Sequence, residues 1–427
     1  MLSPSIAQGQ NHPLVAASWT WNGTWEDAFY GDGNNLWGFG WHQYNNPNCP
    51  NNNWITVPGQ VSPPAYGLST PPSWPEVWYV GADHKLYIAY ANNWAECINN
   101  WWTKPAGNPP GGADLSGAPS ASSDPSKYLG GMVPDVNNEL WEYTYNFNTG
   151  LWGWVDQGQL PEAPDPVHGD ISYVHNSQGA QGPLVAVSYV GKSGHLWVIQ
   201  FTVESGATVR TGQPYDLAAP AYGPWAGGPG LYVTNWDFGG LIAANENNPP
   251  PGTNPYVEVY AFIPNSSGPG WQLVDLANAT SQGCLAGSGG SMSTVGWIEP
   301  DGERNVLGGV MRCRNAQNYG THWFAFYTTD TWTWQFQNDQ FVNGNYPGDD
   351  TTPPYAFINA MTTAQSGGGT SGDIAFIVGV AYANSGGAAY PAEDDYIDCP
   401  SNNPNCGYEG WTPVRWDGPP ANAPPML

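Results

Sequence analysis

The sequence has few charged side chains, and basic ones are the scarcest. Its 427 residues include 9 Lys and Arg against 35 Asp and Glu, which gives a formal net charge of −26. Nucleic-acid-binding proteins neutralise phosphates with Lys and Arg, and anionic membrane surfaces attract the same side chains. Nine basic residues cannot form an extended basic face, so we expect no nucleic-acid partner and no binding to anionic membranes.

Long apolar runs are also missing. No stretch of 18 or more apolar residues occurs, so we expect no membrane insertion. Residues 1–10 have neither the charged start nor the long apolar core of an intact signal peptide. We therefore expect no signal peptide within this chain, whether or not an export segment once preceded it.

The six cysteines lack the spacing of a metal site. No CxxC occurs, and no histidine stands at metal-finger spacing from a cysteine pair. The even count suits three disulfides, although six cysteines allow 15 connectivities. The pairs we expect are Cys399–Cys406, which bracket a short loop, together with Cys284–Cys313 and Cys49–Cys97. Disulfides favour an extracellular or cell-surface location, and the alternative is six buried thiols in a cytosolic protein.

Glycine, proline and aromatic residues are abundant. The chain has 55 Gly and 42 Pro, which leave little room for long helices. It also has 24 Trp, 24 Tyr and 12 Phe, an aromatic content that argues against disorder. We therefore predict an all-β, turn-rich fold.

A pattern of strand, Gly/Asp/Asn turn and Leu-aromatic strand recurs along the chain. Its anchor aromatics are Trp37, Tyr87, Trp141 and Trp197, at spacings of 50 to 56 residues, with weaker counterparts at Tyr260 and Trp323. Residues 230–276 show four short strands in one unit, which is typical of a propeller blade. The period predicts a single β-propeller of seven four-stranded antiparallel blades, closed by pairing its two ends. Six or eight blades, or a pair of β-sandwiches, are the alternatives.

Pro-rich stretches separate the repeats and predict the loops between blades. The chain would then be one domain, because a single four-stranded unit cannot bury both of its faces. The expected blades cover residues 14–60, 75–110, 128–165, 183–220, 230–280, 293–345 and 373–416, followed by a Pro-rich tail at 417–427.

The second and third units run in the order strand, turn, Leu-aromatic pair, clustered tryptophans and Gly/Pro turn, and GADHKLY of the second unit fits the pattern G-x-D-x-x-L-[WY]. EVWYVGADHKLYIAY is followed by NNWAECINNWWTKPAG, and ELWEYTYNFNTGLWGWVDQG follows the same order. Over residues 14–215 the chain resembles sugar-binding propeller lectins, namely bacterial seven-bladed fucose-binding lectins and tectonin-like propellers, and more distantly fungal six-bladed fucose lectins. The resemblance implies a carbohydrate-binding lectin with glycan or glycoconjugate partners.

The positions of the arginines differ from the pattern of the fungal fucose lectins. The fungal fucose lectins resemble one another in an Arg and a Glu at each sugar site, but this chain has no Arg before Arg210. The first three blades would therefore rely on Trp faces and neutral hydrogen-bonding groups.

Clustered tryptophans are the candidate sugar-binding residues. An exposed indole can cover the apolar face of a sugar while neighbouring polar groups meet its hydroxyls. The candidates, expected at sites between blades, are Trp21, Trp25, Trp94, Trp102, Glu96, Glu142, Trp152, Trp154, Trp332 and Trp334. Alternation along a strand places Trp152 and Trp154 on one face and allows only one of Trp101 and Trp102 in the core. For any one Trp the competing interpretation is packing between blades, and it is strongest for the repeat anchors.

Two alternative functions remain open at this point. A propeller glycoside hydrolase needs paired carboxylates, and Glu139 with Glu142, Asp349 with Asp350, or the acidic run at 393–398 could supply them. A non-catalytic protein-interaction or surface-structure propeller needs none. We expect no catalytic residues and no cofactor, although Asp394, Asp395 and Asp398 could hold Ca²⁺.

Overall fold

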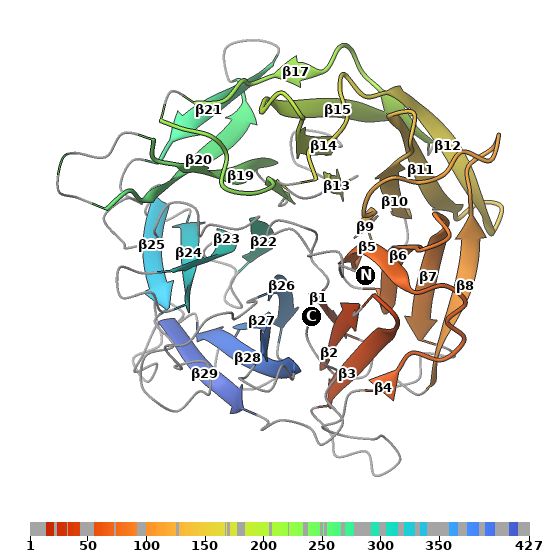
Figure 1. Cartoon of the computed structure of the whole chain (residues 1–427). Coiled ribbons are helices and arrows are strands. Elements are labelled where there is room, and N and C mark those ends of the chain that lie inside the picture. The colour runs from red at the N-terminus through yellow and green to blue at the C-terminus, as the bar shows by residue number, and fades with distance from the viewer. Residues whose placement is uncertain are drawn as a thin grey trace, which may run out of the picture.

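The computed structural model describes the backbone of the strands within residues 14–416. Side chains are described for residues 29, 31, 33–38, 55–71, 74–91, 100–123, 128–166, 168, 171–175, 185–203, 207–220, 222–231, 238–247, 251, 254–265, 270–276, 292, 294, 309 and 311. In these parts of the chain the structure contains 29 strands, arranged as consecutive antiparallel sheets around a common axis (Figure 1).

The first three sheets are blades 1 to 3. Blade 1 comprises β1 (Leu14–Thr20), β2 (Thr24–Gly31), β3 (Leu36–His42) and β4 (Ile55–Thr56). Blade 2 comprises β5 (Pro64–Ser69), β6 (Glu76–Gly81), β7 (Leu86–Ala91) and β8 (Trp101–Gly107). Blade 3 comprises β9 (Ser120–Asp124), β10 (Tyr128–Pro134), β11 (Glu139–Asn146) and β12 (Leu151–Gln159).

The remaining sheets are blades 4 to 7. Blade 4 comprises β13 (Ser172–Asn176), β14 (Leu184–Val190), β15 (Leu196–Glu204), β16 (Ala207–Arg210) and β17 (Tyr215–Asp216). Blade 5 comprises β18 (Gly230–Val233), β19 (Phe238–Asn245), β20 (Val257–Pro264) and β21 (Trp271–Asp275). Blade 6 comprises β22 (Ser293–Ile298), β23 (Asn305–Arg314), β24 (Gly320–Thr328) and β25 (Trp334–Asp339). Blade 7 comprises β26 (Ile358–Gln365), β27 (Ile374–Ala383), β28 (Ala389–Ile397) and β29 (Gly410–Trp416).

The protein is therefore an all-β propeller, and the described strands form seven blades. The first strand of each blade lies nearest the axis and contacts the first strand of the next blade (Figure 1). The ring closes where β1 lies against β26 and β27. Each described sheet uses consecutive strands only, so closure relies on packing between blades and not on the predicted pairing of the two chain ends.

Four blades begin earlier in the sequence than their predicted ranges. β5, β9, β13 and β26 precede residues 75, 128, 183 and 373, where those ranges start. β9 reads SASSD, which is small and polar, and β5 reads PAYGLS, which begins with a proline. Strands this close to the axis have little room for large side chains, so they lack the alternating apolar pattern that marks the outer strands.

Serine side chains connect the innermost strands of neighbouring blades. The backbone N–H of Ala121 donates to Ser69 Oγ at 2.8 Å, that of Tyr173 to Ser120 Oγ at 2.9 Å, and that of Leu231 to Ser172 Oγ at 2.9 Å. The same three serines line an axial cavity of about 120 Å³. These hydroxyls satisfy backbone donors that the neighbouring sheet leaves unpaired at its inner edge.

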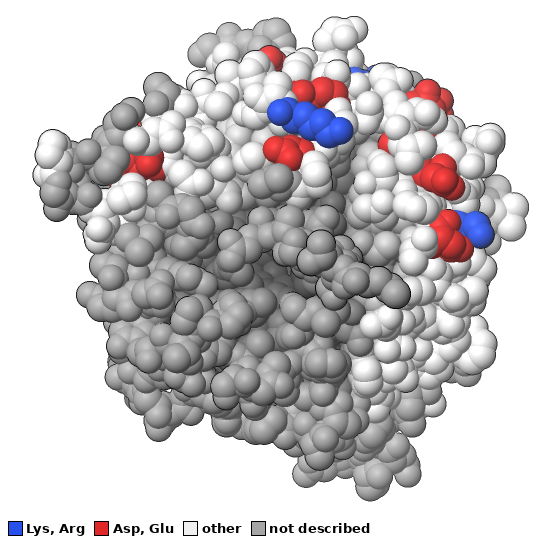
Figure 2. Space-filling model, in the orientation of Figure 1, with Lys and Arg blue, Asp and Glu red and all other residues white. Residues whose placement is uncertain are grey.

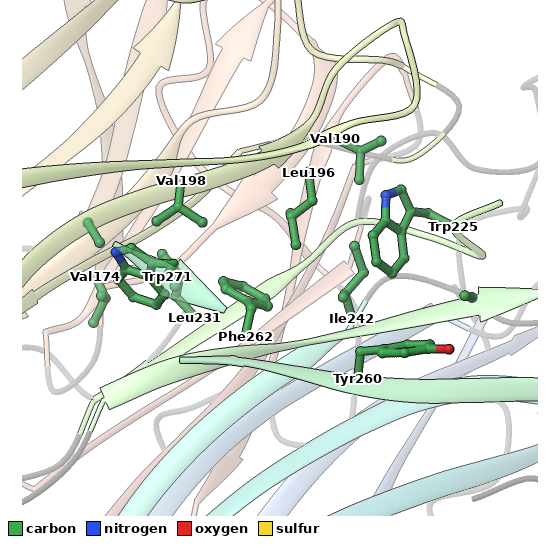
Figure 3. Packing of buried hydrophobic residues seen from close by; sticks show 12 residues of the cluster. Val174, Val190, Leu196, Val198, Trp225, Leu231, Ile242, Tyr260, Phe262 and Trp271 are labelled. Carbon is green, nitrogen blue, oxygen red and sulfur yellow. The ribbon is translucent and has the colours of Figure 1, made fainter. Parts of the chain in front are cut away.

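The core lies between blades. Figure 3 shows the interface of blades 4 and 5, where Val198 and Leu196 of one sheet pack against Phe262 and Ile242 of the next. Comparable clusters join blades 2 and 3, 3 and 4, and 5 and 6. No helix among the described residues is long and apolar enough to cross a membrane.

Candidate functional site

Blade 2 presents a row of polar and aromatic side chains toward blade 3. Strand register places Glu76 of β6 opposite Tyr90 of β7, and Tyr90 opposite Trp102 of β8. Directly opposed residues on neighbouring strands share one face of a sheet, so the three side chains form one line. Lys104 follows two residues after Trp102 and therefore lies on the same face.

Blade 3 supplies the opposing wall. Tyr143 of β11 stacks on Trp152 of β12, with ring centres 5.1 Å apart and planes inclined by 11°. Trp154 lies 4.9 Å from Tyr143, so both tryptophans share one face, which confirms the alternation prediction. Trp78 of blade 2 reaches across to Trp152 at 5.8 Å, so the two blades meet through these rings.

Lys104 lies within this aromatic cluster. Its Nζ is 4.6 Å from the centre of the Trp152 ring and 5.0 Å from that of Tyr90. Ring faces attract an ammonium group at these distances because of their negative quadrupole. The cation is therefore held between one aromatic residue from each blade.

Glu76 is the buried acid of the same cluster. It is 7% exposed, and Trp78 Nε1 donates to its Oε2 at 3.0 Å. Burial raises the pKa of Glu76 to about 7, against the weaker attraction of Lys104 and the hydrogen bond from Trp78. Burial likewise lowers the pKa of Lys104, opposed by the charge of Glu76. The two groups feel each other's charge, and at neutral pH Glu76 is divided between its protonated and ionised forms.

The side chains that form this blade 2–3 site are Glu76, Trp78, Tyr90, Trp102, Lys104, Tyr143, Trp152 and Trp154. Trp102 is 51% exposed and rests on the backbone of Gly59, where an added Cβ would lie 3.0 Å from the ring. Its neighbour Trp101 is 1% exposed and packs 4.6 Å from Phe29 of blade 1. This confirms the prediction that only one of the adjacent tryptophans belongs to the core. Trp102 gives the site an indole face that a ligand can reach.

The equivalent position between blades 4 and 5 is closed. Phe262 and Trp271 occupy the positions in blade 5 that Tyr143 and Trp152 occupy in blade 3. The ring centres of Phe262 and Trp271 are 6.0 Å apart. Trp271 is only 7% exposed and is enclosed with Val174 and Val198 of blade 4 (Figure 3). The same scaffold thus gives a sealed apolar contact in one interface and a polar, accessible site in another.

Glu142, a predicted sugar-binding residue, lies inside the interface between blades 3 and 4. It is fully buried, and its oxygens accept hydrogen bonds from Tyr128 Oη at 2.7 Å, Gln157 Nε2 at 2.7 Å and Thr208 Oγ1 at 3.0 Å. Burial raises the pKa of Glu142, and these three bonds oppose the rise. A carboxylate so enclosed cannot reach a surface ligand or share a solvent-filled site with Glu139. Glu142 is therefore a structural residue that joins two blades.

The aspartates near the repeat anchors stabilise turns through hydrogen bonds. Asp135 Oδ1 accepts from the N–H groups of Asn137 and Glu139, and its Oδ2 accepts from Trp141 Nε1 at 3.1 Å. Asp83 accepts from the Tyr87 hydroxyl at 2.8 Å in the corresponding turn of blade 2. These bonds support a structural role for the anchors Trp141 and Tyr87.

Other predicted residues lie outside the described side chains. Trp21, Trp94, Glu96, Trp332 and Asp398 fall wholly outside the described residues. Trp25, Trp334, Asp394 and Asp395 lie in β2, β25 and β28, whose side chains at these positions are not described. Cys313 lies in β23, and the other five cysteines are outside the described part, so the three disulfides stay predictions. Within the described part, no group of His, Cys, Asp and Glu has a metal-binding arrangement.

Five members of the blade 2–3 site were missed in the sequence: Glu76, Trp78, Tyr90, Lys104 and Tyr143. Strand register places Tyr90 and Trp102, which follow Glu76 by 14 and 26 positions, in one row with it. Sequence spacing alone does not reveal this row. A signal was present, because Glu76 and Tyr90 flank the β6–β7 turn at equal distances. The expectation that sugar recognition in the early blades uses Trp faces and neutral polar groups stays a prediction, and the structure adds the charged group of Lys104 to the cluster.

Comparisons with known proteins give remote structural likenesses. No family model and no curated protein matches the chain. Among solved structures, AofleA from Arthrobotrys oligospora is 16% identical, with a TM-score of 0.43 over 78% of this chain and 88% of its own. The SapL1 lectin in complex with alpha methyl fucoside is 14% identical, with a TM-score of 0.41 over 80% and 100%. The six-bladed Aleuria aurantia lectin is 12% identical, with a TM-score of 0.40 over 78% and 96%. With every TM-score below 0.5, the propeller assignment rests on the sheet order described above.

Proposed function

We propose that the protein is a carbohydrate-binding propeller and that it binds sugars non-covalently at the blade 2–3 site. The observation that carries the proposal is the half-exposed indole of Trp102 in one row with Tyr90 and Glu76, facing the Trp152 wall of the next blade. Aromatic faces suit the C–H surface of a pyranose, and the carboxyl and ammonium groups suit its hydroxyl rim.

Binding is favoured over hydrolysis by the groups that face Glu76. A glycosidase needs two carboxyl groups about 5–10 Å apart across the scissile bond. Among the described residues, the charged partner of Glu76 is Lys104 and not a second carboxylate. One carboxyl group and one separate ammonium group between aromatic side chains can form hydrogen bonds with a sugar, but they do not make the two-carboxylate arrangement of a glycosidase.

We further propose that the protein has fewer binding sites than blades and acts outside the cell. The sealed equivalent between blades 4 and 5 supports the first part. Glycans displayed on surfaces are the natural partners of such a module, and weak single sites would gain strength through multivalent contact.

A glycan-array screen of the purified protein tests this function. Trp102→Ala should abolish or strongly weaken the strongest signals. The matched control is Val209→Ser, which changes another exposed apolar side chain on an outer strand of blade 4. Absence of binding to every arrayed glycan would contradict the proposal, as would equal binding by the Trp102 variant.

A further inference from the structure

Lys104 has no carboxylate within ion-pair distance among the described residues. The ion pairs of that part of the chain join Lys85 to Asp83, His168 to Asp165 and His195 to Asp216. Lys104 is instead held by the rings of Trp152 and Tyr90 and feels Glu76 as a more distant charge. The ammonium group therefore keeps the capacity to accept an anionic partner at short range.

From this arrangement we propose that the blade 2–3 site selects saccharides that carry a carboxylate, and that Glu76 is protonated in the complex. This inference rests on the proposed carbohydrate-binding function and names its ligand class. The sugar carboxylate pairs with Lys104, while the sugar ring lies against Trp102 and Trp152.

Protonation of Glu76 in the complex follows from charge balance in a buried site. The titratable groups that face Glu76 in the described residues are Lys104 from β8, Tyr90 opposite it in β7 and Tyr143 from β11. Tyr143 stays neutral, since burial and the charge of Glu76 both raise its pKa. A second carboxylate beside Lys104 would leave two negative charges facing one positive charge, so the bound ligand favours the protonated form of Glu76.

The net charge of −26 does not attract an anionic ligand. On the face seen in Figure 2, acidic side chains predominate among the described charged groups. A negatively charged ligand gains nothing from such a surface, and long-range repulsion is screened beyond about 8 Å at physiological salt. Selection of an anionic sugar must therefore come from the local cation.

The sign of the pH dependence is fixed by this mechanism. With the pKa of Glu76 near 7 in the free protein, the group must gain a proton to bind the ligand at pH 8 but is already mostly protonated at pH 6. Affinity for a carboxylated sugar should therefore be about tenfold higher at pH 6 than at pH 8. Sugar carboxylates stay ionised over this range, and a neutral sugar of the same ring type should show no such change.

Isothermal titration calorimetry of the whole chain at 0.15 M salt tests the inference. The probes are a glucuronate-terminated oligosaccharide and its glucose-terminated counterpart, each titrated at pH 6 and pH 8 and, at pH 7, in two buffers of different ionisation enthalpy. The expected results are tighter binding of the glucuronate form, the tenfold pH effect for that form only, and uptake of about half a proton at pH 7.

Variants identify the residues responsible. Glu76→Gln should bind the glucuronate form with the same affinity at both pH values. Lys104→Gln should lose the preference for it, and Lys104→Arg should retain much of that preference. Lys85→Gln is the matched control, since it removes one positive charge from the exposed Lys85–Asp83 pair and should leave the preference intact.

The possible outcomes distinguish failure of this inference from failure of the proposed carbohydrate-binding function. Binding of the neutral form with equal or higher affinity overturns the inference and leaves the carbohydrate-binding proposal standing. A pH effect that persists unchanged in Glu76→Gln also overturns it. Failure of both probes and of every arrayed glycan to bind would overturn both proposals together.

Discussion

Lys104 Nζ of blade 2 lies 4.6 Å from the centre of the Trp152 ring of blade 3. This contact joins a cation and an aromatic face across two separate sheets, in the interface that also contains the exposed indole of Trp102. Packing between blades and ligand recognition therefore depend on the same side chains. The predictions below separate the two roles.

Trp102→Ala should weaken binding of a glycan ligand without unfolding the protein. Loss of one sugar-stacking ring should lower affinity about fivefold to tenfold, equivalent to roughly 1–1.4 kcal/mol. Because Trp102 is 51% exposed, the thermal midpoint should change little. Titration calorimetry with a glycan-array ligand and a thermal melt measure the two effects. A large loss of stability with unchanged affinity would make Trp102 a packing residue.

Glu76→Gln should change how stability depends on pH. The pKa of Glu76 is raised from 4.5 to about 7 in the folded protein, so the folded state holds this proton more tightly than the unfolded state. Its stabilising contribution is complete below about pH 4.5 and is lost as pH rises through 7, by roughly 3 kcal/mol in total. Urea unfolding at pH 5 and pH 8 should show this loss in the wild type and a smaller one in Glu76→Gln. Equal pH slopes in the two proteins would contradict the prediction.

Glu142→Ala should destabilise the protein without changing its ligand affinity. Removal of the carboxylate leaves Tyr128, Gln157 and Thr208 without their shared acceptor inside the interface between blades 3 and 4. The expected cost is about 3 kcal/mol, measured as a shift in the urea midpoint. The control is Glu139→Ala, whose half-buried side chain lies on the same strand and should cost under about 1 kcal/mol. A loss of glycan binding by folded Glu142→Ala would contradict the purely structural role and make Glu142 a binding residue.

Ser120→Ala should weaken the junction between the innermost strands of blades 3 and 4. The backbone N–H of Tyr173 would lose its acceptor at 2.9 Å, which costs about 1–2 kcal/mol for a buried donor. Thr202→Ala is the control, because its hydroxyl makes only a long bond of 3.5 Å to Val209 O at an exposed position. Hydrogen exchange at the Tyr173 amide should accelerate in Ser120→Ala and stay unchanged in Thr202→Ala. Unchanged exchange in both would contradict a bridging role.

The propeller fold was readable in the sequence because its repeat carries strong local signals. Anchor aromatics such as Trp141 recur with their turn acids, and alternation alone separated Trp101 from Trp102 and placed Trp152 beside Trp154. Innermost strands such as β9 were missed because small, polar segments like Ser120–Asp124 lack that alternation.

Only some residues of the candidate site could be predicted from the sequence, for a different reason. Spacing marks tryptophans as candidates, but it does not reveal which face of a blade meets a neighbour and which meets solvent. Glu142 looked like a ligand group because it lies near Trp152 in sequence, yet its side chain faces blade 4. Lys104 and Glu76 become candidate binding residues only when strand register and the contact with Trp152 of the next blade are known.

The most direct test is a crystal structure of the protein with its best array glycan. We predict a sugar ring against the Trp102 indole, with a polar group of the ligand within hydrogen-bond distance of Lys104 Nζ and the Trp152 face beside it. A glycan bound at another surface, with the side chains around Lys104 unchanged from those described, would contradict the assignment of the blade 2–3 site.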